Sequence, residues 1–330
     1  MLPQAPAGRR VDCRPAMEFI DGPTLRQLVP MSALLDAVED AFRAVSEGRD
    51  RSPLRSQVPI PGGTLVLMPG VRIGGSGHSL KLVTVMPGNA DRGLPTVQAV
   101  ALWIDADSGE PRYVLDGPTL TAMRTGAASG VSARLLARPD ASVLAVFGAG
   151  AQAEWQIRAV CAARPIREVR VYARRAEALA RFVEAMAPQL EATVRPVASA
   201  AEALAGADVV CTATTATTPV FEAEFVEPGS HVSGVGAFQH SMIELPPALF
   251  SRAALVAVDS REAALAEAGD LVAALSSGEL TDDGFVELGS VPAGWAATRP
   301  ADAITVFKSV GLAIQDLAAA EVAVEALTAR

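Results

Sequence analysis

The chain has 330 residues, half of them hydrophobic, and a formal net charge of −9. This length allows two domains with cores of their own, whereas the acidic charge argues against nucleic acid as a partner. No uncharged apolar run reaches the roughly 18 residues of a membrane span, so no membrane association is expected. Three cysteines and three histidines, widely spaced, predict no disulfide framework and no metal site, but a protein of the reducing cytoplasm.

The first part of the chain predicts a mixed α+β unit. Residues 1–16 carry arginines among prolines without a following apolar segment, so we expect a disordered extension and no signal peptide. A helix is expected at 32–47, with Ser32 as its N-cap. Strand candidates lie at 79–84, 97–104 and 111–115. The last two flank residues 105–109, whose Asp, Ser and Gly content predicts a hairpin and hence antiparallel pairing.

The second part, residues 129–309, alternates short apolar strands with alanine-rich helices. The strand candidates lie at 143–147, 169–172, 208–211, 232–235, 255–258 and 304–307. Helices are expected at 176–186 and 261–275. This alternation is typical of a doubly wound parallel sheet, so the fold class is α/β of the Rossmann type beside the α+β unit. A last helix at 310–330 could pack on either unit, and we group it with the first.

A glycine-rich loop follows the strand at 143–147. It reads Gly148, Ala149, Gly150, Ala151, Gln152 and Ala153, and a helical segment continues from it. Gly148 permits a tight turn, Gly150 lets the backbone approach a pyrophosphate, and Ala153 allows close helix–strand packing. The helix also presents free N–H groups to the phosphates. We therefore expect residues 148–152 to bind a dinucleotide.

The end of the next strand bears on which dinucleotide is bound. An acid there would bind the ribose 2′-hydroxyl of NAD(H), but the chain has Arg174 and Arg175 instead. Guanidinium groups match the 2′-phosphate of NADP(H), so NADP(H) is expected to be preferred and NAD(H) to be possible. The alternative is a solvated basic turn. Thr212 and Thr214 follow a further strand at its carboxyl end, where we expect contacts with the cofactor.

Lysine is scarce in this chain. Only Lys81 and Lys308 occur among the 28 basic residues. Arginine keeps its proton in proteins, whereas a lysine exchanges its proton once burial lowers its pKa. Two chance survivors of a bias toward arginine are one explanation, and two functional positions are the other. The motifs around both lysines favour function.

Four motifs resemble the ornithine cyclodeaminase/mu-crystallin family. They are K-L-V-T-V-M-P-G-N at 81–89, G-L-P-T-V-Q at 93–98, L-T-A-M-R-T-G-A-A-S at 120–129 and T-V-F-K-S-V-G-L-A at 305–313. The resemblance implies a Rossmann domain, residues 129–309, joined to a domain that binds substrate and forms a homodimer through its sheet. Residues 17–128 with the last helix correspond to that domain. It also implies a small amino or imino acid with a carboxylate as the ligand.

The resemblance assigns roles to individual side chains. Arg55, Lys81 and Arg124 correspond to the clamp for the substrate carboxylate, and two guanidiniums with an ammonium suit such a group. Lys81, with its pKa lowered by neighbouring arginines, is the expected catalytic group that protonates or stabilises an iminium. Further positions near the substrate or the cofactor are Thr96, Thr125, Lys308, Ser309 and Gly311.

Phe238 departs from the pattern of the cyclodeaminases. They have an aspartate at this position, which handles the substrate amine, and a lysine where this chain has Met242. This version resembles the reductase branch of the family. Phe238 and His240 are expected on the substrate side, with His240 either a second proton donor or an ordinary loop residue. His231, inside a strand, is expected to be structural.

The sequence therefore predicts an NAD(P)H-dependent imino-acid reductase. The expected substrates are Δ1-pyrroline-2-carboxylate, Δ1-piperideine-2-carboxylate, or an imine of pyruvate with ammonia or an alkylamine. One alternative is an ornithine or lysine cyclodeaminase with bound NAD, which would need another base in place of the missing aspartate. The second alternative is a non-catalytic, crystallin-like dimer that binds NADP(H). Such a protein has no need for a carboxylate clamp.

Overall fold

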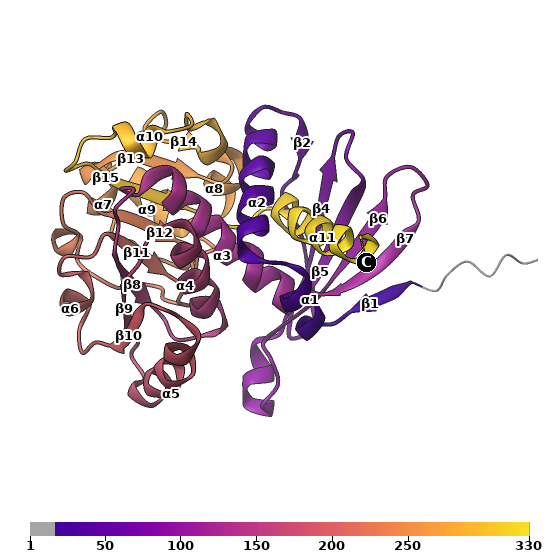
Figure 1. Ribbon diagram of the computed structural model, residues 1–330, viewed down its shortest axis with the longest axis horizontal. Coiled ribbons are helices and arrows are strands. Elements are labelled where there is room, and N and C mark those ends of the chain that lie inside the picture. Colours follow the sequence, from indigo (N-terminus) through magenta and orange to yellow (C-terminus); the bar gives the residue numbers. More distant parts are fainter. Residues whose placement is uncertain (1–16, 330) are drawn as a thin grey trace, which may run out of the picture.

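The computed structural model describes residues 17–329 and places two β-sheets on either side of a group of helices (Figure 1). The predicted extension, 1–16, lies outside the described residues. Among the helices described, none is long and apolar enough to cross a membrane.

The larger sheet has eight strands, all parallel, and is built from residues 143–308. Their order is β10 (Thr193–Pro196), β9 (Glu168–Tyr172), β8 (Val143–Phe147), β11 (Val209–Thr212), β12 (His231–Gly234), β15 (Ile304–Lys308), β13 (Ala253–Val258) and β14 (Val286–Glu287). The intervening helices are α4 (Ala151–Ala163), α5 (Ala176–Met186), α6 (Ala200–Leu204), α7 (Ala248–Arg252), α8 (Arg261–Glu267), α9 (Gly269–Ser276) and α10 (Trp295–Thr298). The doubly wound parallel sheet is confirmed.

The smaller sheet has seven strands within the described residues. They are β1 (Glu18–Ile20), β2 (Asp50–Arg51), β3 (Ser56–Ile60), β4 (Gly63–Arg72), β5 (Gly77–Val85), β6 (Val97–Asp105) and β7 (Pro111–Asp116). The predicted hairpin joins β6 and β7. The antiparallel pairing predicted for these two strands is confirmed, and at one edge of the sheet β1 lies parallel to β7.

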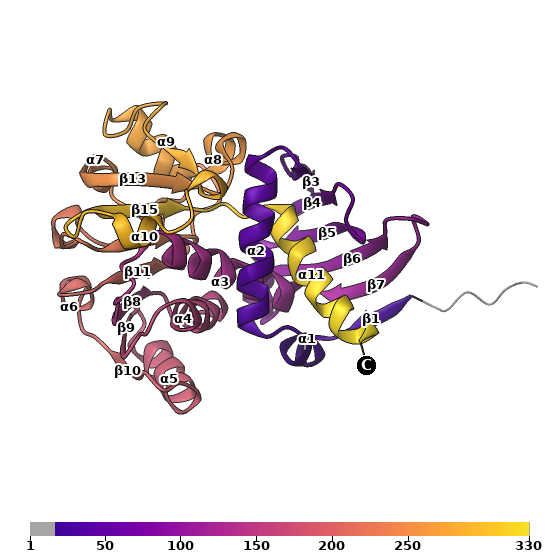
Figure 2. The same cartoon turned by 45° about the horizontal axis from the view of Figure 1, so that its top comes forward.

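Four helices lie between and upon the sheets: α1 (Gly22–Leu28), α2 (Met31–Ser46), α3 (Gly117–Leu136) and α11 (Ala313–Thr328). Figure 2 shows α11 lying across the smaller sheet, next to α2. Helix α3 runs without interruption across residue 128, where we divide the chain into domains. That division therefore stays a prediction, drawn through a shared helix.

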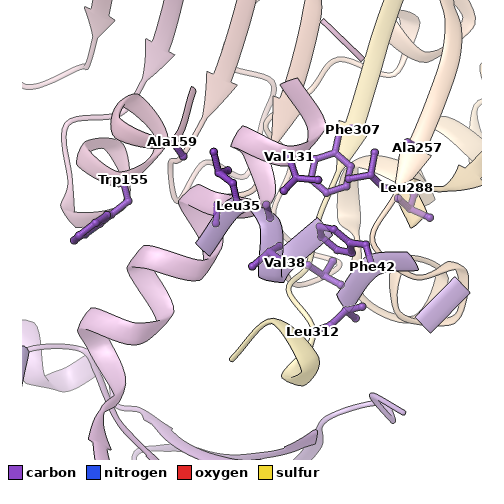
Figure 3. Close-up of a cluster of buried hydrophobic side chains, with 14 of the residues drawn as sticks. Leu35, Val38, Phe42, Val131, Trp155, Ala159, Ala257, Leu288, Phe307 and Leu312 are labelled. Carbon is purple, nitrogen blue, oxygen red and sulfur yellow. The ribbon is translucent and has the colours of Figure 1, made fainter. Parts of the chain in front are cut away.

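Helix α2 contributes to the core that joins the two halves. Phe42 packs edge-on against Phe307 of β15, with 6.1 Å between the ring centroids. Leu35 and Val38 of α2 lie in the same buried cluster, close to Val131 of α3 (Figure 3). Burial of one such side chain contributes about 1.5–3 kcal/mol, so this contact ties the halves into one body.

Two sequence expectations about helix ends were wrong. Helix α2 begins at Met31, with Pro30 and not Ser32 as N-cap, because the fixed φ of proline suits that position and its carbonyl accepts from Leu34. The helix expected at 261–275 is two helices, α8 and α9, separated by Ala268 in an extended conformation. A Cβ on Gly269 would lie 2.1 Å from the carbonyl oxygen of Met242, so the chain turns here to let a loop approach.

Candidate active site

The glycine-rich loop lies between the carboxyl end of β8 and the first turn of α4. Gly148 has a φ of +116°, and a Cβ there would lie 2.6 Å from the carbonyl oxygen of Ala213, so only glycine is accommodated. At Gly150, the N-cap of α4, a Cβ would meet nothing within 4 Å. The side-chain carbonyl of Gln152 is buried without a partner among the described residues. This open, donor-rich helix start fits the pyrophosphate of a dinucleotide.

Glu244 accepts hydrogen bonds from the ends of the neighbouring strands. The sequence did not define this role. Its buried carboxylate accepts from the Thr212 hydroxyl at 2.9 Å and from the backbone N–H groups of Thr214 at 2.6 Å and Gly236 at 2.7 Å. Burial raises the pKa of Glu244. The Thr212 hydroxyl and the Thr214 N–H are thus used internally. Any cofactor contact at these two residues has to come from their remaining atoms.

Arg174 and Arg175 follow β9 after one intervening residue, Ala173, and are both exposed. Neither forms an ion pair with another residue between 17 and 329. Their guanidinium groups therefore remain accessible to an anionic ligand at the end of the second strand.

The centre of the site is a buried cluster of three charges from three elements. Lys81 lies on β5, Arg124 on α3 and Asp316 on α11. The Lys81 ammonium lies 2.8 Å from Oδ2 and 2.9 Å from Oδ1 of Asp316, and Oδ1 also accepts from Arg124 Nε at 2.9 Å. The sequence predicted both cations but missed Asp316, because an acid in an alanine-rich helix is normally solvated.

The cluster sets the protonation of Lys81. Burial lowers the pKa of Lys81 to about 7, the charge of Arg124 acts in the same direction, and Asp316 opposes both. Burial would raise the pKa of Asp316, but Arg124 and Lys81 hold it below its usual range. Lys81 can therefore donate or accept a proton near neutral pH, as a general acid must.

Arg55 reaches the cluster's edge from the loop between β2 and β3. Its Nη2 donates to the carbonyl oxygens of Val310 at 2.7 Å and Gly311 at 2.9 Å, and lies 2.8 Å from Glu267. Gly311 in turn abuts Arg124, since a Cβ there would lie 2.4 Å from Arg124 Nη1. The structure thus brings Arg55, Lys81 and Arg124 into one neighbourhood, as predicted, but pairs Arg55 with an acid that the sequence analysis did not single out.

Lys308 and Ser309 occupy the internal side of the same segment. Lys308 is fully buried, lies 2.8 Å from Asp270 and donates to the Ala237 carbonyl at 2.6 Å. The Ser309 hydroxyl donates to Asp259 at 2.8 Å. The cofactor contact expected of both residues stays a prediction, and the side chains hold the backbone that leads to Gly311.

The remaining predicted positions are less tightly connected. Thr125 is buried beside Arg124 in α3, Phe238 and Thr96 are half-buried, and His240 is exposed. Within residues 17–329, no hydrogen bond joins any of these four side chains to the charge cluster. His231, expected to be structural, is fully buried, and its ring lies 3.0 Å from the Ser132 hydroxyl and 2.9 Å from that of Thr305.

The glycine-rich loop and the parallel sheet define a protein of the Rossmann-like, dinucleotide-binding class. Residues 23–330 match the ornithine cyclodeaminase/mu-crystallin family. The chain belongs to this family, as its motifs predicted.

Individual relatives match over nearly the whole chain. A Δ1-pyrroline-2-carboxylate reductase of Bacillus cereus is 38% identical over 300 residues, which cover 90% of this chain and 92% of that protein. The solved structure of a Thermococcus litoralis Δ1-pyrroline-2-carboxylate reductase with NADH and L-proline superimposes with a TM-score of 0.88 at 33% identity, covering 95% and 98% of the two chains. An archaeal alanine dehydrogenase dimer with bound NAD gives a TM-score of 0.85 at 32% identity and covers 95% and 98%.

Proposed function

We propose that this protein reduces small ketimines that carry a carboxylate to L-amino acids, with Δ1-pyrroline-2-carboxylate or Δ1-piperideine-2-carboxylate as the substrate type. The observation that carries the proposal is the buried Lys81, held between Arg124 and Asp316 with a pKa of about 7. Two similar proteins bear the name of pyrroline-2-carboxylate reductases. Phe238, which has no acid–base group, supports reduction over ornithine cyclisation.

The chain's own residues bind and orient the imine. Arg124, together with Arg55, binds the carboxylate. This contact would position the imine carbon next to the nicotinamide ring of a bound cofactor. A bound nicotinamide cofactor supplies the hydride that this carbon accepts. Lys81 gives the proton from Nζ to the imine nitrogen, so that the C=N bond becomes CH–NH and Lys81 is left neutral. Solvent protons restore the ammonium after the product leaves.

NADP(H) is the cofactor that Arg174 and Arg175 favour. Both are exposed at the end of β9, the place where an acid would bind the 2′-hydroxyl of NAD(H). NAD(H) remains a usable cofactor, since the loop at 148–152 contacts only the part that both share. NADH and NAD are the cofactors of the two similar structures.

The reaction takes place in the cytoplasm, and the two thiols among residues 17–329 are unreactive. Cys161 and Cys211 are both free, which suits a reducing compartment. Burial raises the pKa of the Cys161 thiol to about 11 and that of Cys211 to about 12. Neither forms the thiolate that oxidation needs at neutral pH.

The working form is a homodimer joined through the smaller sheet. Successive side chains of a strand point to opposite faces, so Leu82 points away from the face on which Lys81 meets α11. Leu82 and its cross-strand partner Val100 are 36% and 38% exposed, and Phe19 is 60% exposed. An uncovered apolar face of this kind suits a second copy, and a similar alanine dehydrogenase is a dimer.

The reaction is tested with a panel of imino acids. We expect NADPH to be consumed with Δ1-pyrroline-2-carboxylate, Δ1-piperideine-2-carboxylate or a mixture of pyruvate and methylamine, and no ammonia to form from L-ornithine or L-lysine. Absorbance of NADPH and an ammonia assay report the two outcomes. Ammonia from ornithine without net cofactor change would identify a cyclodeaminase. If NADPH is not consumed and no ammonia forms, the remaining interpretation is a non-catalytic dimer that binds the dinucleotide.

Substitution of Lys81 tests the proton donor. Lys81→Met should lower kcat about 10²- to 10⁴-fold, because the methionine fills the space but carries no proton. Stopped-flow NADPH oxidation measures this, with the affinity for NADPH and the thermal midpoint as controls that should change little. A near-normal kcat would exclude Lys81 as the acid.

Removal of the two arginines tests the cofactor preference. The double variant Arg174→Ala, Arg175→Ala should raise KM for NADPH at least about tenfold, since charge-assisted bonds to the 2′-phosphate are lost. KM for NADH should stay unchanged. Arg181→Ala on α5, which removes an exposed arginine that pairs with Glu177, is the matched control. The preference is refuted if wild-type protein uses NADH with the higher kcat/KM.

A charged residue on the apolar face tests the dimer. Leu82→Glu should shift the protein from dimer to monomer in sedimentation velocity, because burying the carboxylate at an interface costs several kcal/mol. Leu265→Glu is the control, since Leu265 is similarly exposed at 38% but lies on α8 of the other domain. A Leu82→Glu protein that sediments as a dimer would place the interface elsewhere.

A further inference from the structure

Asp316 holds two of the three cations of the clamp, Lys81 and Arg124, although no sequence motif assigned it a role. Its side chain is fully buried in the first turn of α11. One oxygen, Oδ1, accepts from both Lys81 and Arg124 at 2.9 Å, and Oδ2 lies 2.8 Å from Lys81. The preceding residue, Gln315, accepts from Arg124 Nη1 at 2.7 Å. Two like charges that would otherwise repel are thus fixed side by side.

The charges in this neighbourhood can be counted. When Lys81 is protonated, Lys81 and Arg124 carry one positive charge each and Asp316 one negative charge, which leaves a single positive charge in excess. Arg55 and Glu267, paired at 2.8 Å, cancel each other. The strand neighbours of Lys81, Met68 and Ala101, are uncharged. Among the described residues, the positive charge of the clamp therefore exceeds its negative charge by one, which a single anion would compensate.

Burial makes this count matter. A charge removed from water is costly unless an opposite charge lies close by, and the effect is stronger where the surroundings exclude water. One carboxylate brings the clamp to neutrality. A second carboxylate would leave an uncompensated negative charge beside Lys81, Arg124 and Asp316, each of which is less than a tenth exposed.

We propose that Asp316 is a positioning residue that orients Lys81 and Arg124 and limits the site to imino acids with a single carboxylate. This rests on the proposed function for the imino acid, but the limit on charge concerns binding alone.

The charge limit is tested first on the wild-type protein without catalysis. Calorimetry on the NADPH complex compares pyridine-2-carboxylate with pyridine-2,6-dicarboxylate, which differ by one carboxylate. We expect the monocarboxylate to bind at least about tenfold more tightly. Equal affinities, or tighter binding of the dicarboxylate, would overturn the proposal. Because no turnover is involved, this result is independent of whether the protein reduces imines.

Asp316→Asn then removes the negative charge and keeps an acceptor for Arg124. Measured at a pH well below the pKa of Lys81, where the ammonium stays protonated, the preference for the monocarboxylate should fall about tenfold or more, because the cluster then carries two excess positive charges. Glu325→Gln, which removes the same charge from an exposed position of the same helix, should leave the preference unchanged. An unchanged preference in Asp316→Asn would show that Asp316 only stabilises the fold.

A pH profile separates positioning from simple damage. The charged groups that act on Lys81 are Arg124 and Arg55, which lower its pKa, and Asp316, which raises it. Loss of Asp316 should therefore lower the pKa of Lys81 further, and the alkaline limb of kcat/KM should move to lower pH. Glu325→Gln should keep the wild-type limb. If Asp316→Asn lost activity equally at every pH, the positioning role would be refuted, whatever imine the enzyme reduces.

Discussion

The ion pairs that the buried carboxylate of Asp316 forms with Lys81 and Arg124 are the interaction on which the arrangement of this molecule depends. Taking three charges out of water costs several kcal/mol per ion, and only close, well-oriented partners offset this. The partners come from β5, α3 and α11, which are far apart in sequence. These three charges lie together because the last helix, α11, returns to the smaller sheet after the larger sheet is complete (Figure 2). Helix α11 is held in this position because it packs on β4 and β5.

The same return connects the larger sheet to the smaller sheet. The segment after β15 is held by Asp259, which accepts from the backbone N–H groups of Val310 at 2.9 Å and Gly311 at 2.7 Å. Gly311 then touches Arg124, and Arg55 donates to its carbonyl. A shift of the carboxyl end of β15 would therefore also move the residues of the clamp, because main-chain contacts link the two. This explains why glycine, with a φ of +84°, is needed at 311: a side chain there would displace the guanidinium.

Sequence patterns predicted what local physics determines. Strand–helix alternation gave the parallel sheet, the α5 bounds of 176–186 were predicted to the residue, and the loop at Gly148 was identified from its spacing. Arg124 and Lys81 were expected together through the family motifs. Asp316 was missed because helical periodicity says nothing about which distant cations an acid will meet. The split of the helix at Ala268 was missed for a similar reason, since it depends on the close approach of Gly269 to another loop.

Scarcity of lysine identified two important positions, but not two of one kind. Both lysines are buried, and each lies 2.8 Å from an aspartate. Lys308 donates to the Ala237 carbonyl within a fully buried ion pair, a contact that fixes a loop. Lys81 instead shares its aspartate with Arg124, whose charge weakens the hold on its proton. The two lysines therefore differ in the second cation that lies beside Lys81, and only folding brings that cation close.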